Sequence, residues 1–243
     1  MPAYKAIFLF GVLFAAIAVK AQNSIEFNPL YGTAIWNPDS SYTNFAGESL
    51  QINKCLFYTS GWKAIINHQN KKGQTDTVIL SNAHYLIDLS EPKSLKLPFT
   101  VPAHATQLIF TLGVDSIKNT TGIQTGVLDP ARGMFWTWRT GYIMARMQGT
   151  SPSANTAGKR FSYDVGGFES PYNAVRTIAL KLPETAGSDN HAKNPLYIQT
   201  DLSKWFQGKH TISIAQTPNC HNAGKLAMQL ADNYQQLFQL LLH

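Results

Sequence analysis

The densest group of residues that could do chemistry is aromatic and lies in residues 113–149. Trp136 and Trp138 stand one residue apart there, in a chain that has five tryptophans, with Phe135 and Tyr142 nearby. Side chains alternate along an extended strand, so Trp136 and Trp138 would share one face and Phe135 would take the other. Such a pair can bind a ligand, but aromatic residues more often cover a core, and both interpretations stay open.

Imidazole side chains are the next candidates, because they ligate metals. His84, His104, His191, His210 and His221 are scattered, and none forms a His-x-His or His-x-x-x-His pair. The fold would therefore have to assemble any site, and a lone histidine is more often a satisfied polar residue than a ligand. We single out His84 and His221 as the candidate metal ligands.

Three oxygen-bearing side chains form a possible calcium set. Asp115, Asn119 and Asp129 offer the carboxylate and amide oxygens that Ca²⁺ prefers. The same residue types routinely cap turns with their side-chain oxygens, and turn capping is the more economical interpretation.

Cys55 and Cys220 are the only cysteines. An even number of cysteines makes a disulfide the first hypothesis for a chain that leaves the cytoplasm. Two buried free thiols, or a thiolate metal site in which Cys220 acts with His221, remain as alternatives, because spacing alone does not prove contact.

Enzyme signatures are absent from the sequence. It has no Gly-x-Ser-x-Gly elbow, no His-Glu-x-x-His and no phosphate-binding loop, and only 14 acidic residues. We therefore predict a protein that is not an enzyme. The carboxylates of a glycosidase need not be close in sequence, so that class is not excluded.

The elements that must position these residues are short segments rich in β-branched and aromatic residues, separated by turn signals such as Asn37-Pro38-Asp39 and Lys72-Gly73. This pattern is typical of an antiparallel β protein. The predicted strands are 24–27, 50–58, 77–80, 85–89, 106–114, 142–147, 160–165, 176–182, 196–200 and 210–214.

The carboxy-terminal segment has a different period. In residues 223–242 apolar side chains recur every three or four positions, which predicts an amphipathic helix. Its polar face carries almost no Lys or Arg, so it should pack on the sheets and not on a membrane surface. The predicted fold is all-β, an antiparallel β-sandwich with long loops and a carboxy-terminal helix, in one domain over residues 22–243.

Residues 1–21 read as a secretory signal peptide. Lys5 precedes a mainly apolar run that ends in Val19-Lys20-Ala21, a sequence that suits signal peptidase after Ala21. The run is shorter than the roughly 20 apolar residues that span a bilayer. We therefore expect a periplasmic or secreted protein with no membrane span after cleavage.

The basic residues are spread along the chain. The formal net charge is +6, and loss of Lys5 and Lys20 with the signal peptide would lower it by two. Lys and Arg do not gather into a stripe, so no nucleic-acid partner is expected.

Four blocks of the sequence resemble the MbnP-like family, exported proteins named for a partner of the methanobactin gene cassette and related to the copper-binding proteins MopE and CorA. The longest is GVDSIKNTTGIQTGVLDPARGMFWTWRTGYI, residues 113–143. The others, in the expected order, are YLIDLSEPKSL at 85–95, FSYDVGGF at 161–168 and LADNYQQLF at 230–238. The resemblance covers most of the chain after the signal peptide.

The resemblance implies copper binding without known catalysis. It implies a site of histidine imidazoles and an oxidised tryptophan, kynurenine, made after export by a dihaem peroxidase-type (MbnH-like) partner. Trp136 or Trp138 would be the modified residue. The histidine imidazoles would suit copper as ligands. The family usually has histidines where this chain has Pro29 and Asp164. Asp164 is still a candidate metal ligand beside His84 and His221, although its carboxylate would favour harder cations such as Ca²⁺.

Three functions from different classes follow from these observations. The first is an exported metal-binding protein, with copper implied by the resemblance. The second is a metal-free relative that binds a partner or ligand through Trp136, Trp138 and Tyr142. The third is a carbohydrate-processing enzyme or lectin that stacks tryptophans on sugar rings.

Overall fold

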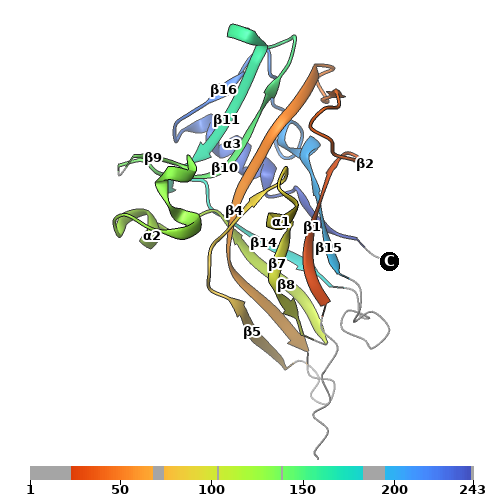
Figure 1. Cartoon of the computed structure of the whole chain (residues 1–243), viewed down its shortest axis with the longest axis vertical. Coiled ribbons are helices and arrows are strands. Elements are labelled where there is room, and N and C mark those ends of the chain that lie inside the picture. The colour runs from red at the N-terminus through yellow and green to blue at the C-terminus, as the bar shows by residue number, and fades with distance from the viewer. Residues whose placement is uncertain (1–22, 68–73, 103, 138, 183–194, 242–243) are drawn as a thin grey trace, which may run out of the picture.

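The computed structural model describes residues 23–67, 74–102, 104–137, 139–182 and 195–241. The predicted signal peptide, Trp138 and His191 lie outside these residues. Within them the protein is mostly β, with its strands in mixed sheets in a sandwich-like arrangement (Figure 1). The predicted all-β sandwich class is confirmed, with one difference: β1 pairs with β15, and β11 with β16, in parallel.

The smaller of the two main sheets is built around the first described strand and has the order β17-β15-β1-β2, with β7 also paired to β1. Its strands are β1 (Asn23–Tyr31), β2 (Ala34–Ile35), β7 (Lys96–Val101), β15 (Leu196–Asp201) and β17 (Phe238–Leu240).

The larger sheet has the order β14-β8-β4-β10-β11-β16, with β3, β5 and β6 paired to β4 and β9 to β10. The central strands of this sheet are β4 (Ser49–Asn67), β8 (Ala105–Leu112), β10 (Gly141–Thr150), β11 (Arg160–Gly166), β14 (Arg176–Lys181) and β16 (Asn219–Cys220). The shorter ones are β3 (Tyr42–Thr43), β5 (Thr75–Ser81), β6 (Tyr85–Asp88) and β9 (Phe135–Thr137). A separate hairpin joins β12 (Phe168–Glu169) to β13 (Tyr172–Asn173).

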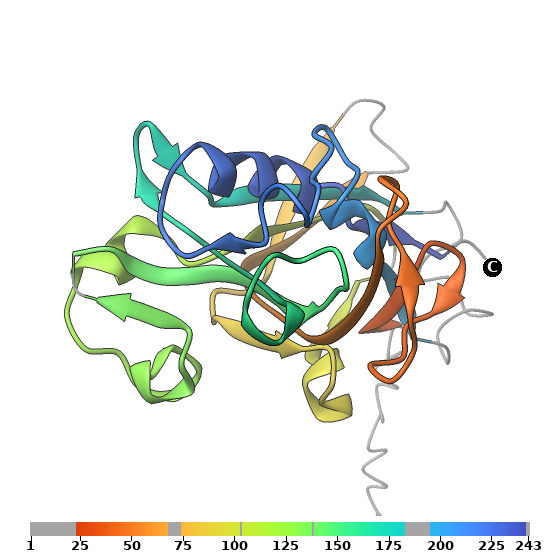
Figure 2. The same cartoon turned by 90° about the horizontal axis from the view of Figure 1, so that it is seen from above.

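Helices are short and lie outside the sheets. The α-helices are α1 (Pro92–Leu95), α2 (Ser116–Thr120) and α3 (Lys225–Tyr234), and the 3₁₀ turns are Gly126–Leu128, Pro130–Arg132, Ala157–Lys159 and Leu202–Trp205. Helix α2 and strand β9 project to one side of the larger sheet (Figure 1). Figure 2 shows α3 lying over the larger sheet, where it contacts β11.

Strand β4 joins the two halves of the molecule. Its first half pairs with β10 and its second half with β8 and β5. Gly61 has a φ of 59° at the register shift between Ser60 and Lys63. A positive φ of this kind is costly for other residues, so Gly61 allows the strand to bend without breaking the sheet.

An aromatic cluster fills the space between the two sheets. The ring of Phe27, on β1, lies edge-on to those of Phe57 and Phe110, with centroids 5.6 and 6.5 Å apart. Trp62 stacks on Phe110 at 4.2 Å, and Phe238 of β17 closes the cluster. Each of these side chains is at most 5% exposed, so the cluster holds the smaller sheet on the larger one.

Nine of the ten predicted strands are present, and the tenth is wrong. Residues 210–214 are a loop with one isolated bridge, Gln207 to Thr211. The amide of Asn233 fixes this loop by accepting from His210 N at 2.7 Å and donating to His210 O at 2.7 Å.

The predicted carboxy-terminal helix is present but shorter than its apolar period suggested. It ends at Tyr234, and Phe238–Leu240 forms β17 against β15. The register of β17 on β15 buries Phe238 in the aromatic cluster. This burial favours a strand over the helix that the apolar period predicted.

The predicted disulfide is wrong, because Cys55 and Cys220 are both buried free thiols. The register explains it: Cys55 pairs with Met147, Met147 with Tyr163, and Tyr163 with Cys220. Three strand spacings put the two α-carbons about 14 Å apart. A disulfide needs them within about 7 Å. Burial raises the pKa of both thiols, that of Cys220 to about 11.

Candidate functional site

The candidate site begins with two charged side chains that face each other across β10 and β11. Arg146 and Asp164 are register partners on these antiparallel strands. Arg146 Nε lies 2.5 Å from Asp164 Oδ1, and Nη2 lies 3.1 Å from Oδ2. Both side chains are largely buried, and this two-point contact fixes the plane of the carboxylate.

The same carboxylate also holds an imidazole. His221, directly after β16, places Nδ1 3.3 Å from Asp164 Oδ2. An ionised carboxylate only accepts hydrogen bonds, so Nδ1 carries the proton and donates. The second ring nitrogen, Nε2, then has a free lone pair in the neutral ring. The side chain of His221 is 52% exposed, so this nitrogen is within reach of solvent species.

Trp136 covers the next position of the same face. Asp164 and Gly166 are two residues apart on β11, so they point to the same side of the sheet. A Cβ on Gly166 would lie 2.7 and 2.9 Å from two carbons of the Trp136 ring. Glycine at this position is therefore what lets the half-buried indole lie against β11.

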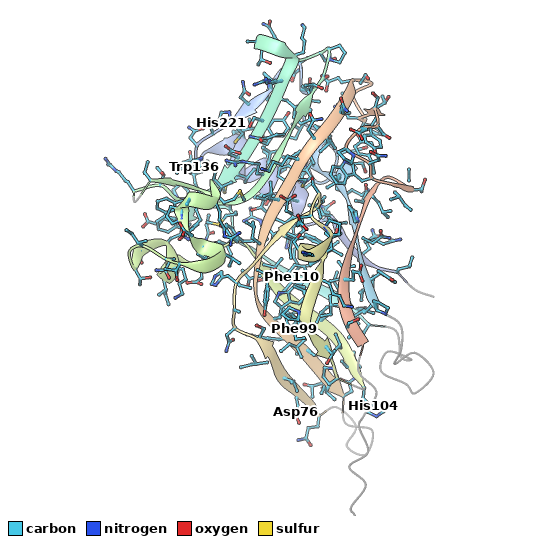
Figure 3. The ribbon with its side chains drawn as sticks, viewed as in Figure 1. Asp76, Phe99, His104, Phe110, Trp136 and His221 are labelled. Carbon is cyan, nitrogen blue, oxygen red and sulfur yellow. The ribbon has the colours of Figure 1, made fainter. Side chains whose placement is uncertain are left out.

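Together Trp136, Arg146, Asp164, Gly166 and His221 form what we call the β11 face. Figure 3 shows Trp136, on β9, and His221, directly after β16, at the same end of the molecule. The aromatic core residue Phe110 lies elsewhere, deeper between the sheets (Figure 3). The β11 face therefore combines a half-buried indole, an ion pair and an accessible imidazole.

His84 belongs to a different neighbourhood. Its Nε2 lies 3.2 Å from Asp115 Oδ2, within ion-pair distance. Burial and the nearby Lys118 lower the pKa of His84, although Asp115 acts in the opposite direction. Across the described part of the chain, no three of His, Cys, Asp and Glu gather in a metal-sized group. The structure therefore does not bring His84 together with Asp164 and His221.

The residues of the predicted calcium set use their side chains to fix loops. Asp115 caps α2 by accepting from Lys118 N at 3.0 Å, and Asp129 accepts from Ala131 N at 2.8 Å. Asn119 is 2% exposed, and its Oδ1 accepts from Tyr142 N at 2.8 Å. These contacts match turn capping, the interpretation preferred from the sequence.

Tyr142 is a core residue. It is 1% exposed, and its hydroxyl donates to Leu128 O at 2.6 Å. Its ring lies 4.9 Å from that of Phe135. The predicted contact surface of Trp136, Trp138 and Tyr142 therefore cannot include Tyr142.

Arg146 and Gly166 were missed by sequence reasoning. The sequence did carry a signal for Arg146. This residue stands between residues that are buried in strand 141–150, as Asp164 does in strand 160–166. Antiparallel pairing of two such strands brings their polar faces together, but the register needed to pair these two residues is not visible in the sequence.

The fold and the β11 face define a sandwich-like β protein with a small polar site at one end of its larger sheet. The model of the MbnP family matches residues 20–222, and the chain belongs to that family. The resemblance seen in the sequence is confirmed.

The structure of MbnP from Methylosinus trichosporium aligns with a TM-score of 0.52 at 12% identity, over 84% of this chain and 82% of that one. This likeness concerns the fold. No curated protein matches the sequence. Of the helices described, none has the length and apolar character to cross a membrane.

Proposed function

We propose that this protein is an exported, non-catalytic, copper-related member of the MbnP family that binds its metal at the β11 face. His221 supplies an imidazole, and an oxidised Trp136 or Trp138 supplies the second donor. The observation that carries the proposal is the contact of Asp164 with Nδ1 of His221. Family membership supports the metal and the accessory role.

The contact matters because histidines that ligate metals usually donate their other ring N–H to a carboxylate or carbonyl. This hydrogen bond selects the tautomer and turns the free nitrogen toward the metal. Asp164 is then a positioning residue and not a ligand. Arg146 holds Asp164 in place through its two contacts.

A family-type site built on several imidazoles does not fit the described residues. Pro29 has no donor side chain and lies in β1, where it pairs with Thr200 in the smaller sheet. Asp164 is engaged by Arg146 and His221. The donors that remain are His221 and a modified tryptophan, whose amine and ketone would add to one imidazole.

Export and a partner complete the proposal. Residues 1–21 would direct the chain to the periplasm or beyond, and a dihaem peroxidase-type partner would oxidise the tryptophan there. Trp136 suits such a reaction because its indole is only half buried, on a strand that projects from the larger sheet (Figure 1).

A second candidate function is a metal-free binding module. The charge of the β11 face favours it, because Arg146 cancels the negative charge of Asp164 and leaves little field to attract a cation. In that case Trp136 and His221 would contact a partner molecule directly.

Intact mass of the protein purified from its native host separates the two candidates. We expect a mass change that fits one tryptophan converted to kynurenine, located by peptide mapping at Trp136 or Trp138. Trp136→Phe should lose this mass change if Trp136 is the modified residue. Trp205→Phe is its control and should keep the change, since Trp205 is fully buried and lies outside β9. An unmodified wild-type mass would contradict the oxidised-tryptophan ligand and favour the metal-free module.

A further inference from the structure

A groove of about 700 Å³ lies beside the β11 face, over the outer surface of the larger sheet. This volume is within the range of small-molecule sites. The groove crosses β4, β10, β11 and β16, which lie side by side at one end of the sheet (Figure 1). The lining residues that carry the argument are Lys54, Gln148, Arg160, Ser162, Asn219 and His221.

Four of these residues form a polar row because of strand register. Lys54 pairs with Gln148, Gln148 with Ser162, and Ser162 with Asn219. Residues directly opposite each other share a face of the sheet, so the four side chains stand together. Gln148 Nε2 donates to Ser162 Oγ at 3.1 Å, which orients the middle of the row.

The groove is positively charged. Lys54 and Arg160 are exposed, and neither has an ion-pair partner among the described residues. No Asp or Glu is among the described residues that line the groove. Asp164 lies in the next row but is already engaged by Arg146 and His221, so it does not neutralise these two cations.

The two cations stand at separate ends of the groove. Lys54 is on β4 and Arg160 is on β11, with β10 between them. Two strand spacings sideways and a two-residue offset along β11 place their backbones about 12 Å apart. Ala157 and Gly149 also line the groove, so it is partly apolar.

From this arrangement we propose that the groove binds a small organic anion with two carboxylate groups joined by a short carbon chain. Lys54 and Arg160 contact one carboxylate each, and the amide and hydroxyl groups of the row donate hydrogen bonds between them. The groove borders the proposed copper site and shares His221 with it. The contacts proposed here come from Lys54, Arg160 and the polar row, so occupation does not require copper or an oxidised tryptophan.

Calorimetry with metal-free protein tests the inference, with adipate and hexanoate as probes. These acids have equal carbon number but two and one carboxylates, respectively. We expect adipate to bind at least tenfold more tightly than hexanoate or inorganic phosphate at low salt, and more weakly as salt rises. A Lys54→Met/Arg160→Met variant should bind adipate at least tenfold more weakly.

The control variant is Lys63→Met/Lys181→Met, which removes the same charge from exposed positions on β4 and β14 outside the groove. It should bind adipate as the wild type does. Absence of adipate binding to the wild type would overturn the proposal, as would equal losses in both double variants or equal affinity for adipate and phosphate. Because the protein is metal-free, the result does not depend on copper binding.

Discussion

A Glu48→Ala variant is expected to lose about 4 kcal/mol of the free energy of unfolding, measured by urea denaturation. Glu48 is 8% exposed, and its carboxylate accepts from Ile214 N at 2.7 Å, Ala215 N at 2.9 Å and Ser213 Oγ at 2.8 Å. It also accepts from Asn44 Nδ2 at 2.7 Å. Hydrogen bonds to a charged group contribute roughly 1.5–3 kcal/mol each, and alanine leaves backbone donors of the 213–215 loop unpaired.

The pH dependence gives a second readout of the same contacts. Burial alone would raise the pKa of Glu48, but hydrogen bonds from Ala215, Asn44, Ile214 and Ser213 outweigh it and lower the pKa from 4.5. A lowered folded-state pKa stabilises the protein above the unfolded value, and this stabilisation is lost as pH falls below about 4.5. Glu48→Gln should flatten this part of the stability profile. A wild-type slope in Glu48→Gln, or a loss under 1 kcal/mol in Glu48→Ala, would contradict the assignment.

An Asn119→Ala variant is expected to lose about 3 kcal/mol and to loosen the segment that carries Trp136. The buried amide donates to Val114 O at 3.0 Å and Asp115 O at 2.9 Å, and accepts from Tyr142 N at 2.8 Å. Alanine would remove the partner of Val114 O and of Tyr142 N and open a gap beside Gly141, while Asp115 O would keep its hydrogen bond from the backbone N of residue 119. Denaturant unfolding gives the loss. Because the chain has five tryptophans, the fluorescence that is lost in a Trp136→Phe background reports the environment of Trp136.

Asn173→Ala is the matched control for Asn119→Ala. Asn173 is exposed, and its Oδ1 accepts only a local hydrogen bond, from Val175 N at 2.9 Å. Its loss should cost under about 1 kcal/mol. If the two variants were equally stable, Asn119 would not be the residue that anchors this segment.

Local sequence patterns predicted most of the strands because β-branched and aromatic residues alternate within them. They failed where distant contacts decide the structure. Residues 210–214 have strand-like composition, but Asn233 and Glu48 hold the adjoining backbone in a loop. Phe238 continues a helical period, yet burial against Phe57 and Phe110 places it in a strand. Such contacts involve residues far apart in the chain.

Strand order and register also could not be predicted from the sequence. The sequence alone could not show that β10 and β11 separate Cys55 from Cys220, so the disulfide hypothesis failed. It could not show the parallel pairing of β1 with β15 either. Both features follow from which strands become neighbours, a property of the whole fold.

The candidate site was predicted in part. His221 and Asp164 were chosen as separate ligands, and the structure places them in one hydrogen-bonded unit. Arg146 escaped notice because an arginine on a strand is usually a solvated side chain, and only the register shows it opposite Asp164. The capping roles of Asp115 and Asp129 were predictable because they depend on neighbouring residues.

Copper content after loading tests the central claim, that His221 is a metal ligand positioned by Asp164. Protein from the native host is loaded with copper, freed of excess metal and measured by elemental analysis and competition titration. We expect stoichiometric copper on the wild type, little on His221→Ala, and roughly 10- to 100-fold weaker binding by Asp164→Asn. His210→Ala, which removes an imidazole bound to Asp232, should match the wild type. Copper-free wild type, or His221→Ala that keeps wild-type affinity, would contradict the account.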